Sequence, residues 1–246
     1  MRLGIISDIH ANQLALEAVL TRCAALQVEQ QIVLGDLVGY GPDPEATVQR
    51  IMRLQASGAV VLMGNHDEAI ANTASNMNAI ALAAIVWTRP RLSDSSKAFL
   101  AQLPLTHQQD DMLFVHADAS DPAHWNYVTD ANSARISLGA TPAHLTLCGH
   151  AHRPQLYCST ATAKVVQHQP ATDAVIPLAP QRRWLGVIGS VGQPRDGNPA
   201  AGFAIYDTQS RELTFKRAPY DAEAAAARLR AAGLPEALAT RLLSGR

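Results

Sequence analysis

Apolar and polar positions follow a regular order in the first third of the chain. Residues 3–6 form a short apolar run that ends at the polar residues Ser7 and Asp8, which is typical of a buried parallel strand. Apolar residues then recur at helical spacing over residues 16–26. This pattern predicts a helix, with Asn12 as its N-terminal cap.

The same order continues to residue 65. Residues 31–36 and 59–65 are apolar runs that end in polar residues, so we predict two more strands. Between them, Asp43 and Pro44 are typical of a helix start, with Asp as the cap and Pro at the first helical position. Strands that alternate with helices predict a parallel sheet and an α/β protein.

Strands and helices stop alternating after the third strand. Residues 68–103 have a helical, alanine-rich pattern that is broken near Pro90. Residues 220–246 predict two terminal helices, with a break at Gly233 and Pro235. Short apolar runs separated by Gly, Pro, Asp and Asn predict the strands of a second sheet, at residues 112–116, 145–150, 184–189, 203–207 and 212–216.

The composition is that of a globular protein with a sizeable core. The chain has 246 residues, 48% of them apolar and 17% charged, and this length allows one large domain or two small ones. It carries 20 basic and 21 acidic side chains, for a formal net charge of −1. Because no basic excess is present, we do not expect bulk binding of nucleic acid.

No segment of the sequence predicts a membrane span. The longest apolar stretch, residues 79–87, is far shorter than the roughly 20 residues that cross a bilayer. The chain opens directly with a strand, so we expect a cytoplasmic location. Cys23, Cys148 and Cys158 lack metal-type spacing, and we expect them to be small apolar core residues in a reducing compartment.

Polar clusters follow five of the predicted strands at their carboxyl ends. Ligands bind at this edge of open parallel sheets, so we expect the clusters to meet at one rim. Each motif alone is weak evidence, but their joint occurrence at strand ends predicts a metal centre. The clusters are Asp8-Ile9-His10, Gly35-Asp36, Asn65-His66-Asp67, Val115-His116 and His150-Ala151-His152.

The donor set indicates two metal ions. Carboxylate, imidazole and carboxamide groups without a thiolate suit divalent manganese, iron, zinc, cobalt or nickel, and we expect manganese first. The candidate ligands are too many for one ion, whereas two ions that share Asp36 as a bridge use them all. Such a pair lowers the pKa of a bridging water and orients phosphoryl oxygens, so a metal-bound hydroxide would attack phosphorus. The candidates are Asp8, His10, Asp36, Asn65, His116, His150 and His152.

In their order along the chain, the five motifs resemble those of the calcineurin-like metallophosphoesterase superfamily. The resemblance implies a four-layer α/β/β/α sandwich of two mixed sheets with flanking helices. It also implies that His66 stabilises the transition state or protonates the leaving oxygen. By the same resemblance, one metal site is formed by Asp8, His10, Asp36 and His152, and the other by Asp36, Asn65, His116 and His150.

One departure from the superfamily pattern concerns the loop after Asp36. The protein serine/threonine phosphatase branch has an Asp-Arg pair there, whereas this chain reads Leu-Val-Gly-Tyr-Gly-Pro over residues 37–42. The loop instead resembles the small bacterial phosphodiesterase-like members. Because the departure removes the usual acidic partner of the catalytic histidine, Asp67 is the candidate to orient His66.

Other candidate positions each have two interpretations. Arg195, in residues 189–197, either grips a substrate phosphate or belongs to a structural loop held by Asp196, and Arg153 is a second candidate for phosphate binding. Tyr40 either stacks on a substrate base or covers the sheet edge. Residues 118–127, with His124, Trp125 and Tyr127, form either a substrate-side wall or ordinary packing.

These observations lead to one main hypothesis. We expect a metallophosphoesterase domain at residues 1–219 and a C-terminal helical extension at 220–246 packed on it. The domain would hydrolyse a phosphodiester in a small-molecule substrate. The alternatives are a phosphomonoesterase acting on a small molecule or phosphoprotein, and a non-catalytic metal-binding scaffold. Residues 222–229 look amphipathic, as a packed helix or a homodimer contact would be.

Overall fold

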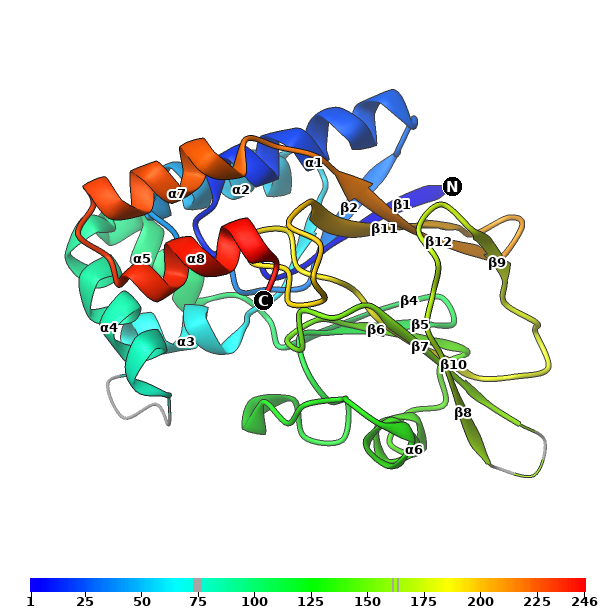
Figure 1. Cartoon of the computed structure of the whole chain (residues 1–246). Helices are drawn as coiled ribbons and strands as arrows, with labels where there is room; N and C mark the ends of the chain where they lie inside the picture. The colour runs from blue at the N-terminus through cyan, green and yellow to red at the C-terminus, as the bar shows by residue number, and fades with distance from the viewer. Residues whose placement is uncertain (73–76, 161, 163) are drawn as a thin grey trace.

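The computed structural model describes residues 1–72, 77–160, 162 and 164–246 of the chain. Two mixed sheets of six strands each pack face to face, and helices cover both outer faces (Figure 1). Helices α1 (Gln13–Ala25) and α2 (Pro44–Ala56) lie on the first sheet, and α6 (Ala131–Gly139) lies on the second. The protein is therefore a four-layer α/β/β/α sandwich, as expected.

The first sheet combines the predicted parallel strands with strands from the end of the chain. Its order is β3-β2-β1-β11-β12-β9, and β1, β2 and β3 are parallel. The strands are β1 (Arg2–Ile6), β2 (Gln30–Val33), β3 (Val60–Val61), β9 (Val175–Pro177), β11 (Ala201–Asp207) and β12 (Glu212–Ala218).

The prediction that residues 203–207 and 212–216 belong to the second sheet was wrong. Strand β11 pairs antiparallel with β1, with Leu3 opposite Tyr206, and β12 pairs with β11. All but the last residue of β11 are buried, because this strand lies inside the sheet between β1 and β12. An apolar run shows that a strand is buried but does not show which strand it pairs with.

The second sheet has the order β4-β5-β6-β10-β7-β8. Its parallel strands β5, β6 and β10 were predicted, whereas β4, β7 and β8 were not. The edge strands β4 and β8 contain polar residues and are partly exposed, so they lack an apolar pattern. The strands are β4 (Thr106–Gln109), β5 (Met112–Val115), β6 (Leu145–Cys148), β7 (Gln155–Ser159), β8 (Val165–His168) and β10 (Trp184–Val187).

The first residues of the helices agree only in part with the predicted helix starts. The Asn12 side chain caps α1 by accepting a hydrogen bond from the Ala15 N–H at 3.2 Å. Pro44 is the first residue of α2, but the Asp43 side chain makes no capping hydrogen bond. The predicted strand at 59–65 is shorter than expected, because Asn65 already begins the helix α3 (Asn65–Ala71). This early start places the Asn65 side chain at the amino end of a helix.

Residues 68–103 form a layer of short helices rather than one long helix. Residues 73–76 of this stretch lie outside the described residues. The described part comprises the remainder of α3, then α4 (Ala79–Thr88), a 3-10 turn with Pro90 at its centre (Arg89–Arg91), and α5 (Asp94–Ala101). The break expected near Pro90 is therefore present.

The two terminal helices pack on the same body as the rest of the chain. Helices α7 (Ala222–Ala231) and α8 (Glu236–Ser244) form an apolar cluster with Tyr40 and with Ala81 and Ala84 of α4. The Gly197 N–H donates a hydrogen bond of 2.8 Å to the Gly245 carbonyl, which connects the end of α8 to the loop after β10. The division at residue 220 remains a prediction.

The core explains why the central strands are continuously apolar. Leu3 and Ile5 of β1 point between the sheets, where they join Phe114 and Leu147 of the second sheet. Ile6 belongs to the cluster under α1 and α2. Both faces of β1 are therefore buried, as in other sheets covered on both sides. Among the described helices, none is long and apolar enough to cross a membrane.

Candidate metal centre

The predicted polar clusters meet at one edge of the sandwich. The loops after β1 and β2, the start of α3, and the loops after β5 and β6 all contribute. Every one of these loops follows the carboxyl end of a strand, as expected for an open parallel sheet. The side chains brought together are Asp8, His10, Asp36, Asn65, His116, His150 and His152, and all but Asn65 are buried.

The first group of candidate ligands consists of Asp8, His10, Asp36 and His152. One ligand atom from each lies within 4.8 Å of all the others. His152 Nε2 is 3.3 Å from Asp8 Oδ1, and His10 Nε2 is 3.5 Å from Asp36 Oδ2. The two Nε2 atoms are 3.1 Å apart. The four side chains therefore point at a common volume.

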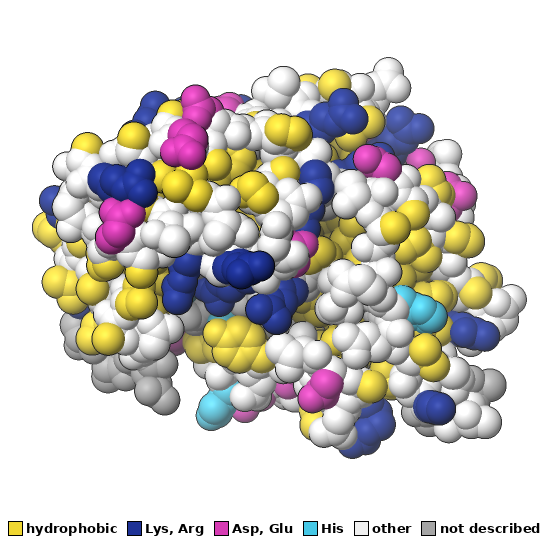
Figure 2. Space-filling model, in the orientation of Figure 1, with side chains coloured by type: hydrophobic (Ala, Val, Ile, Leu, Met, Phe, Trp, Pro, Cys, Tyr) yellow, Lys and Arg dark blue, Asp and Glu magenta, His cyan; other side chains and the backbone are white. Residues whose placement is uncertain are grey.

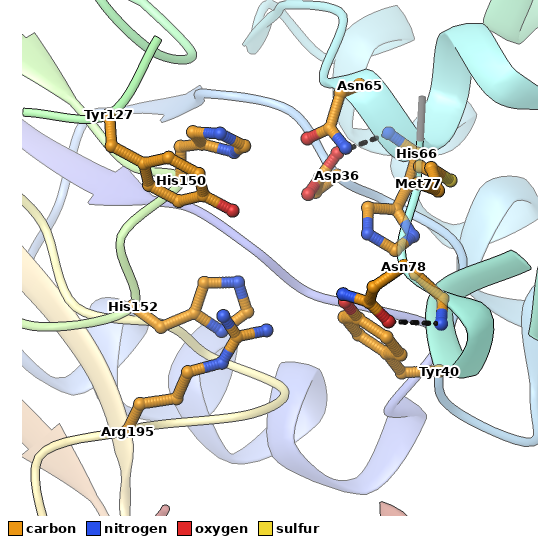
Figure 3. Close-up of a pocket in the computed structure, with 11 residues that line it drawn as sticks. Asp36, Tyr40, Asn65, His66, Met77, Asn78, Tyr127, His150, His152 and Arg195 are labelled. Atoms are coloured by element: carbon orange, nitrogen blue, oxygen red, sulfur yellow. Dashed lines mark hydrogen bonds between the residues drawn. The ribbon is translucent and has the colours of Figure 1, made fainter. Parts of the chain in front are cut away.

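The second group contains Asp36, His116 and His150, again with ligand atoms within 4.8 Å of one another. His116 Nε2 is 3.5 Å from Asp36 Oδ2, the same oxygen that faces His10. Asn65 lines the same pocket, and its side chain lies beside Asp36 (Figure 3). Asp36 thus belongs to both groups, as the bridging prediction requires.

Backbone carbonyls fix the orientation of three imidazole rings. The Nδ1 atoms of His10, His116 and His152 donate to the carbonyls of Val38, Leu34 and Gln193, at 3.1, 2.9 and 2.7 Å. With the proton held at Nδ1, His10 and His152 present the Nε2 lone pair to the group. Burial alone would lower the pKa of His116, but the charge of Asp36 outweighs it and raises that pKa to about 9, so a cation would displace a proton from this ring. Burial lowers the pKa of His10 and His152 well below the usual value, and that of His150 to about 3. These three rings are therefore neutral and suited to bind a cation.

Unpartnered buried atoms show that the site fits divalent metal ions. Among the described residues, Nε2 of His116, Nε2 of His150 and Oδ1 of Asn65 are buried without a hydrogen-bond partner. Buried polar atoms are normally satisfied, so these three call for an additional partner. Nitrogen and oxygen donors without a thiolate suit divalent transition metals.

The two carboxylates among the candidate ligands differ in their surroundings. Asp36 Oδ1 accepts the His66 N–H at 2.8 Å, which leaves Oδ2 facing the two histidines. Burial alone would raise the pKa of Asp36, but the neighbouring His116 and His66 rings outweigh it and hold that pKa well below its usual range. Burial raises the pKa of Asp8 to about 6, with His116 opposing the rise.

Backbone conformation at the rim is unusual and was not predicted from the sequence. Five candidate ligands have φ in the left-handed region, which costs a non-glycine residue roughly 1–2 kcal/mol. Such conformations cluster at functional sites, where the surrounding structure enforces them. The residues and their φ values are Asp8 at 54°, His10 at 49°, Asp36 at 53°, His150 at 64° and His152 at 57°.

His66 lies beside the metal groups with its ring buried. Its centroid is 4.7 Å from that of His10 and 4.5 Å from that of Tyr40. A Cβ atom at Gly39, where φ is +84°, would lie only 2.2 Å from His66 Nδ1. Since Nδ1 lies against Gly39, the Nε2 side of the ring is left to face a substrate.

Asp67 does not orient His66, contrary to the candidate role suggested above. Its Oδ1 accepts the Leu37 and Val38 N–H groups at 2.9 and 3.3 Å, and its Oδ2 accepts the Gly64 N–H at 3.0 Å. Burial raises the pKa of this carboxyl to about 7, and the charge of Asp36 adds to the rise. Asp67 connects the loop after β2 to the start of α3.

Tyr40 is the residue that packs against His66, and the sequence did not indicate this role. It is only 5% exposed, its ring contacts His10 and His66, and it belongs to the apolar cluster of α7 and α8. Tyr40 also lines the pocket, but its burial favours the covering interpretation over stacking on a substrate base. The sequence does not reveal this position of Tyr40, because the helices α7 and α8 that pack on it are far away in the chain.

The two candidate arginines lie together at the mouth of the site. Arg195 enters the pocket (Figure 3), and its Nη2 donates to Gln193 Oε1 at 3.1 Å. Arg153 Nε donates to the Arg195 carbonyl at 2.8 Å. Asp196 forms its ion pair with Arg217, which fixes the loop that carries Arg195. Arg195 therefore reaches the pocket, where a phosphate-binding residue would lie, and Asp196 holds the loop, as the structural interpretation expects.

Within residues 118–127, only Tyr127 lines the pocket. Its ring stacks on His150 with centroids 4.0 Å apart. Trp125 Nε1 donates to Glu68 Oε2 at 2.9 Å, and His124 pairs with Asp121. Tyr127 alone of this segment thus faces the pocket, whereas Trp125 is held by Glu68 and His124 is exposed.

Comparison with known proteins agrees with the geometry. The chain is 32% identical over 251 residues to an uncharacterized protein of Methanocaldococcus jannaschii, covering 99% of this chain and 98% of that protein. A metallophosphoesterase from Sphaerobacter thermophilus has 37% identity and a TM-score of 0.89, covering 100% of this chain and 99% of that chain.

A hypothetical protein from Pyrococcus horikoshii OT3 shares the fold, with a TM-score of 0.80 at 19% identity, covering 100% of this chain and 98% of that chain. Residues 1–211 match the calcineurin-like phosphoesterase superfamily domain. The fold, the order of the motifs and these matches agree, and the chain belongs to the calcineurin-like phosphoesterase superfamily.

Proposed function

We propose that this protein is a phosphodiesterase that uses two divalent transition-metal ions, with manganese as the first candidate. Its family supports a phosphoric ester hydrolase. The observation that carries the two-ion proposal is the position of Asp36, whose Oδ2 lies 3.5 Å from Nε2 of both His10 and His116. One carboxylate oxygen placed between two ligand groups is the arrangement of a bridge.

The ligand roles follow from the two groups. Asp8, His10, Asp36 and His152 would hold one ion, and Asp36, His116, His150 and Asn65 the other. When bound, the two ions supply a nucleophilic hydroxide at neutral pH and neutralise charge on the phosphoryl oxygens. The fixed Nδ1 hydrogen bonds of three of the histidines hold the ligand atoms in place beforehand.

His66 and Arg195 would act on the substrate itself. His66 Nε2 would give its proton to the leaving alcohol oxygen as the phosphorus–oxygen bond breaks. Arg195 reaches the pocket from the opposite side, and its guanidinium would bind non-bridging phosphoryl oxygens. His66 would act in its protonated form and become neutral as the alcohol leaves, and the positive guanidinium suits the negative charge of the phosphoryl oxygens.

Metal analysis followed by a paired assay tests this function. We expect the purified protein, after chelation and reloading with manganese, to hydrolyse bis(p-nitrophenyl) phosphate faster than p-nitrophenyl phosphate. A faster monoester reaction would overturn the diester assignment and favour the phosphomonoesterase. No hydrolysis with manganese, iron, zinc or cobalt would contradict the enzymatic proposal and favour the non-catalytic scaffold.

A further inference from the structure

We propose that the cleft beside the metal centre binds a second phosphate group of the substrate, away from the one that is hydrolysed. This inference rests on the proposed function and names a substrate class for it. The cleft lies between the loop before α6, the segment that starts β7, and the loop after β10. Its polar lining consists of Tyr127, Thr129, Arg153, Gln155, Gln167 and Arg195.

The two neighbouring hollows differ in size, so each fits a different part of a substrate. The pocket at the metal centre has a volume of about 80 Å³, which suits little more than the reacting phosphoryl group. The adjoining cleft has a volume of about 450 Å³, within the range of small-molecule sites. Tyr127 and Arg195 line both, so the two hollows are neighbours.

The charge of the cleft selects an anion. Two guanidinium groups line it, and no carboxylate does among the described residues. Among those residues, the side chain of Arg153 makes one hydrogen bond, from Nε to the Arg195 carbonyl, which leaves its two terminal nitrogens without a protein partner. Figure 2 shows further Lys and Arg side chains gathered over the end of α8 and the neighbouring loop after β10.

The paired guanidinium groups favour phosphate over a less charged anion. The hydrogen bond between Arg153 Nε and the Arg195 backbone holds the two residues side by side. A phosphate has three terminal oxygens and a charge near −2, and guanidinium groups bind such oxygens in pairs. Arg153 thus faces the second phosphate alone, while Arg195, which lines both hollows, lies between the two phosphates with donors for each.

Tyr127 is the boundary between the two hollows. Its ring lies parallel to His150, with centroids 4.0 Å and planes 20° apart, and 51% of the residue is exposed. A substrate with one phosphate at the metal centre and another in the cleft would cross this ring. The inferred class is therefore a phosphodiester whose organic part carries an additional phosphate.

A pair of chromogenic substrates tests the inference. The p-nitrophenyl ester of thymidine 5′-phosphate is compared with the same compound carrying a 3′-phosphate, using manganese-loaded protein. We expect kcat/KM to be about tenfold higher for the 3′-phosphorylated substrate, and Arg153→Gln to remove most of this preference. Arg135→Gln on α6, where Arg135 contacts only Asn132, is the matched control and should keep the preference.

A binding measurement keeps this test separate from the proposed function. Calorimetry of thymidine 3′,5′-bisphosphate and thymidine 5′-phosphate should show about tenfold tighter binding of the bisphosphate, lost in Arg153→Gln. This result with no turnover of either ester would support the cleft and contradict the proposed function. Turnover with equal kcat/KM for the two esters, or a preference that survives Arg153→Gln, would overturn the cleft assignment alone.

Discussion

Tyr40 packs its ring against His66, with centroids 4.5 Å apart and planes at 56°, and it also belongs to the apolar cluster of α7 and α8. The C-terminal helices therefore reach the candidate proton donor through one aromatic side chain. Among the described residues His66 Nδ1 has no hydrogen-bond partner, so we expect this ring contact to position His66.

Replacing Tyr40 with leucine should lower kcat about tenfold while leaving the metal content unchanged, because His66 loses its packing surface but the ligands remain. Tyr40→Phe keeps the ring and should retain most of the activity. Steady-state kinetics and metal analysis of both variants provide the check. Equal kcat in Tyr40→Leu and the wild type would show that the ring contact does not position His66.

Gly39→Ala should lower turnover by displacing the His66 ring, since the new Cβ would lie 2.2 Å from Nδ1. Gly58→Ala is the matched control, because Gly58 also has a positive φ, of +99°, but nothing lies within 4 Å of the added atom. Both variants should lose about 1 kcal/mol of unfolding free energy from backbone strain. Similar activities in Gly39→Ala and Gly58→Ala would show that a steric contact with His66 does not affect turnover.

His66→Ala should retain its metal and lose at least about 100-fold in kcat, since His66 is placed as proton donor and not as ligand. His124→Ala is the control, because His124 is exposed and pairs only with Asp121. Metal content is measured together with turnover of bis(p-nitrophenyl) phosphate. Unchanged turnover in His66→Ala would refute the role.

Asp36→Asn should reduce binding at both metal sites, whereas Asp8→Asn should reduce binding at one. The reason is that Asp36 belongs to both ligand groups and Asp8 to the first alone. We expect about two manganese ions per chain in the wild type, about one in Asp8→Asn and fewer in Asp36→Asn. Equal stoichiometry in the two variants would be inconsistent with a bridging carboxylate.

The sequence predicted the meeting of the candidate ligands because each follows a strand, and parallel strands end at one edge. The carboxylates at Asp8 and Asp36 and the imidazole at His116 needed only that rule. The pairing of strands that are distant in the chain could not be predicted from the sequence. Strand β11 would have the same apolar pattern in either sheet, and only the three-dimensional structure places it beside β1.

The sequence also did not predict which residues surround His66. Asp67 is its neighbour in the chain, yet its carboxylate binds backbone N–H groups of residues 37, 38 and 64. Tyr40 takes up the position beside the ring because the loop after β2 adopts left-handed conformations at Gly39 and Tyr40. No local propensity indicates that a tyrosine would adopt such a conformation.

Asp36 uses its two oxygens for different tasks. One oxygen accepts the backbone N–H at the first turn of α3, and the other faces both histidine groups. A carboxylate is a rigid plane, so any movement of one oxygen toward an incoming cation also moves the other. Cation uptake at one oxygen would therefore be tied, through this one side chain, to the backbone of His66, the proposed proton donor.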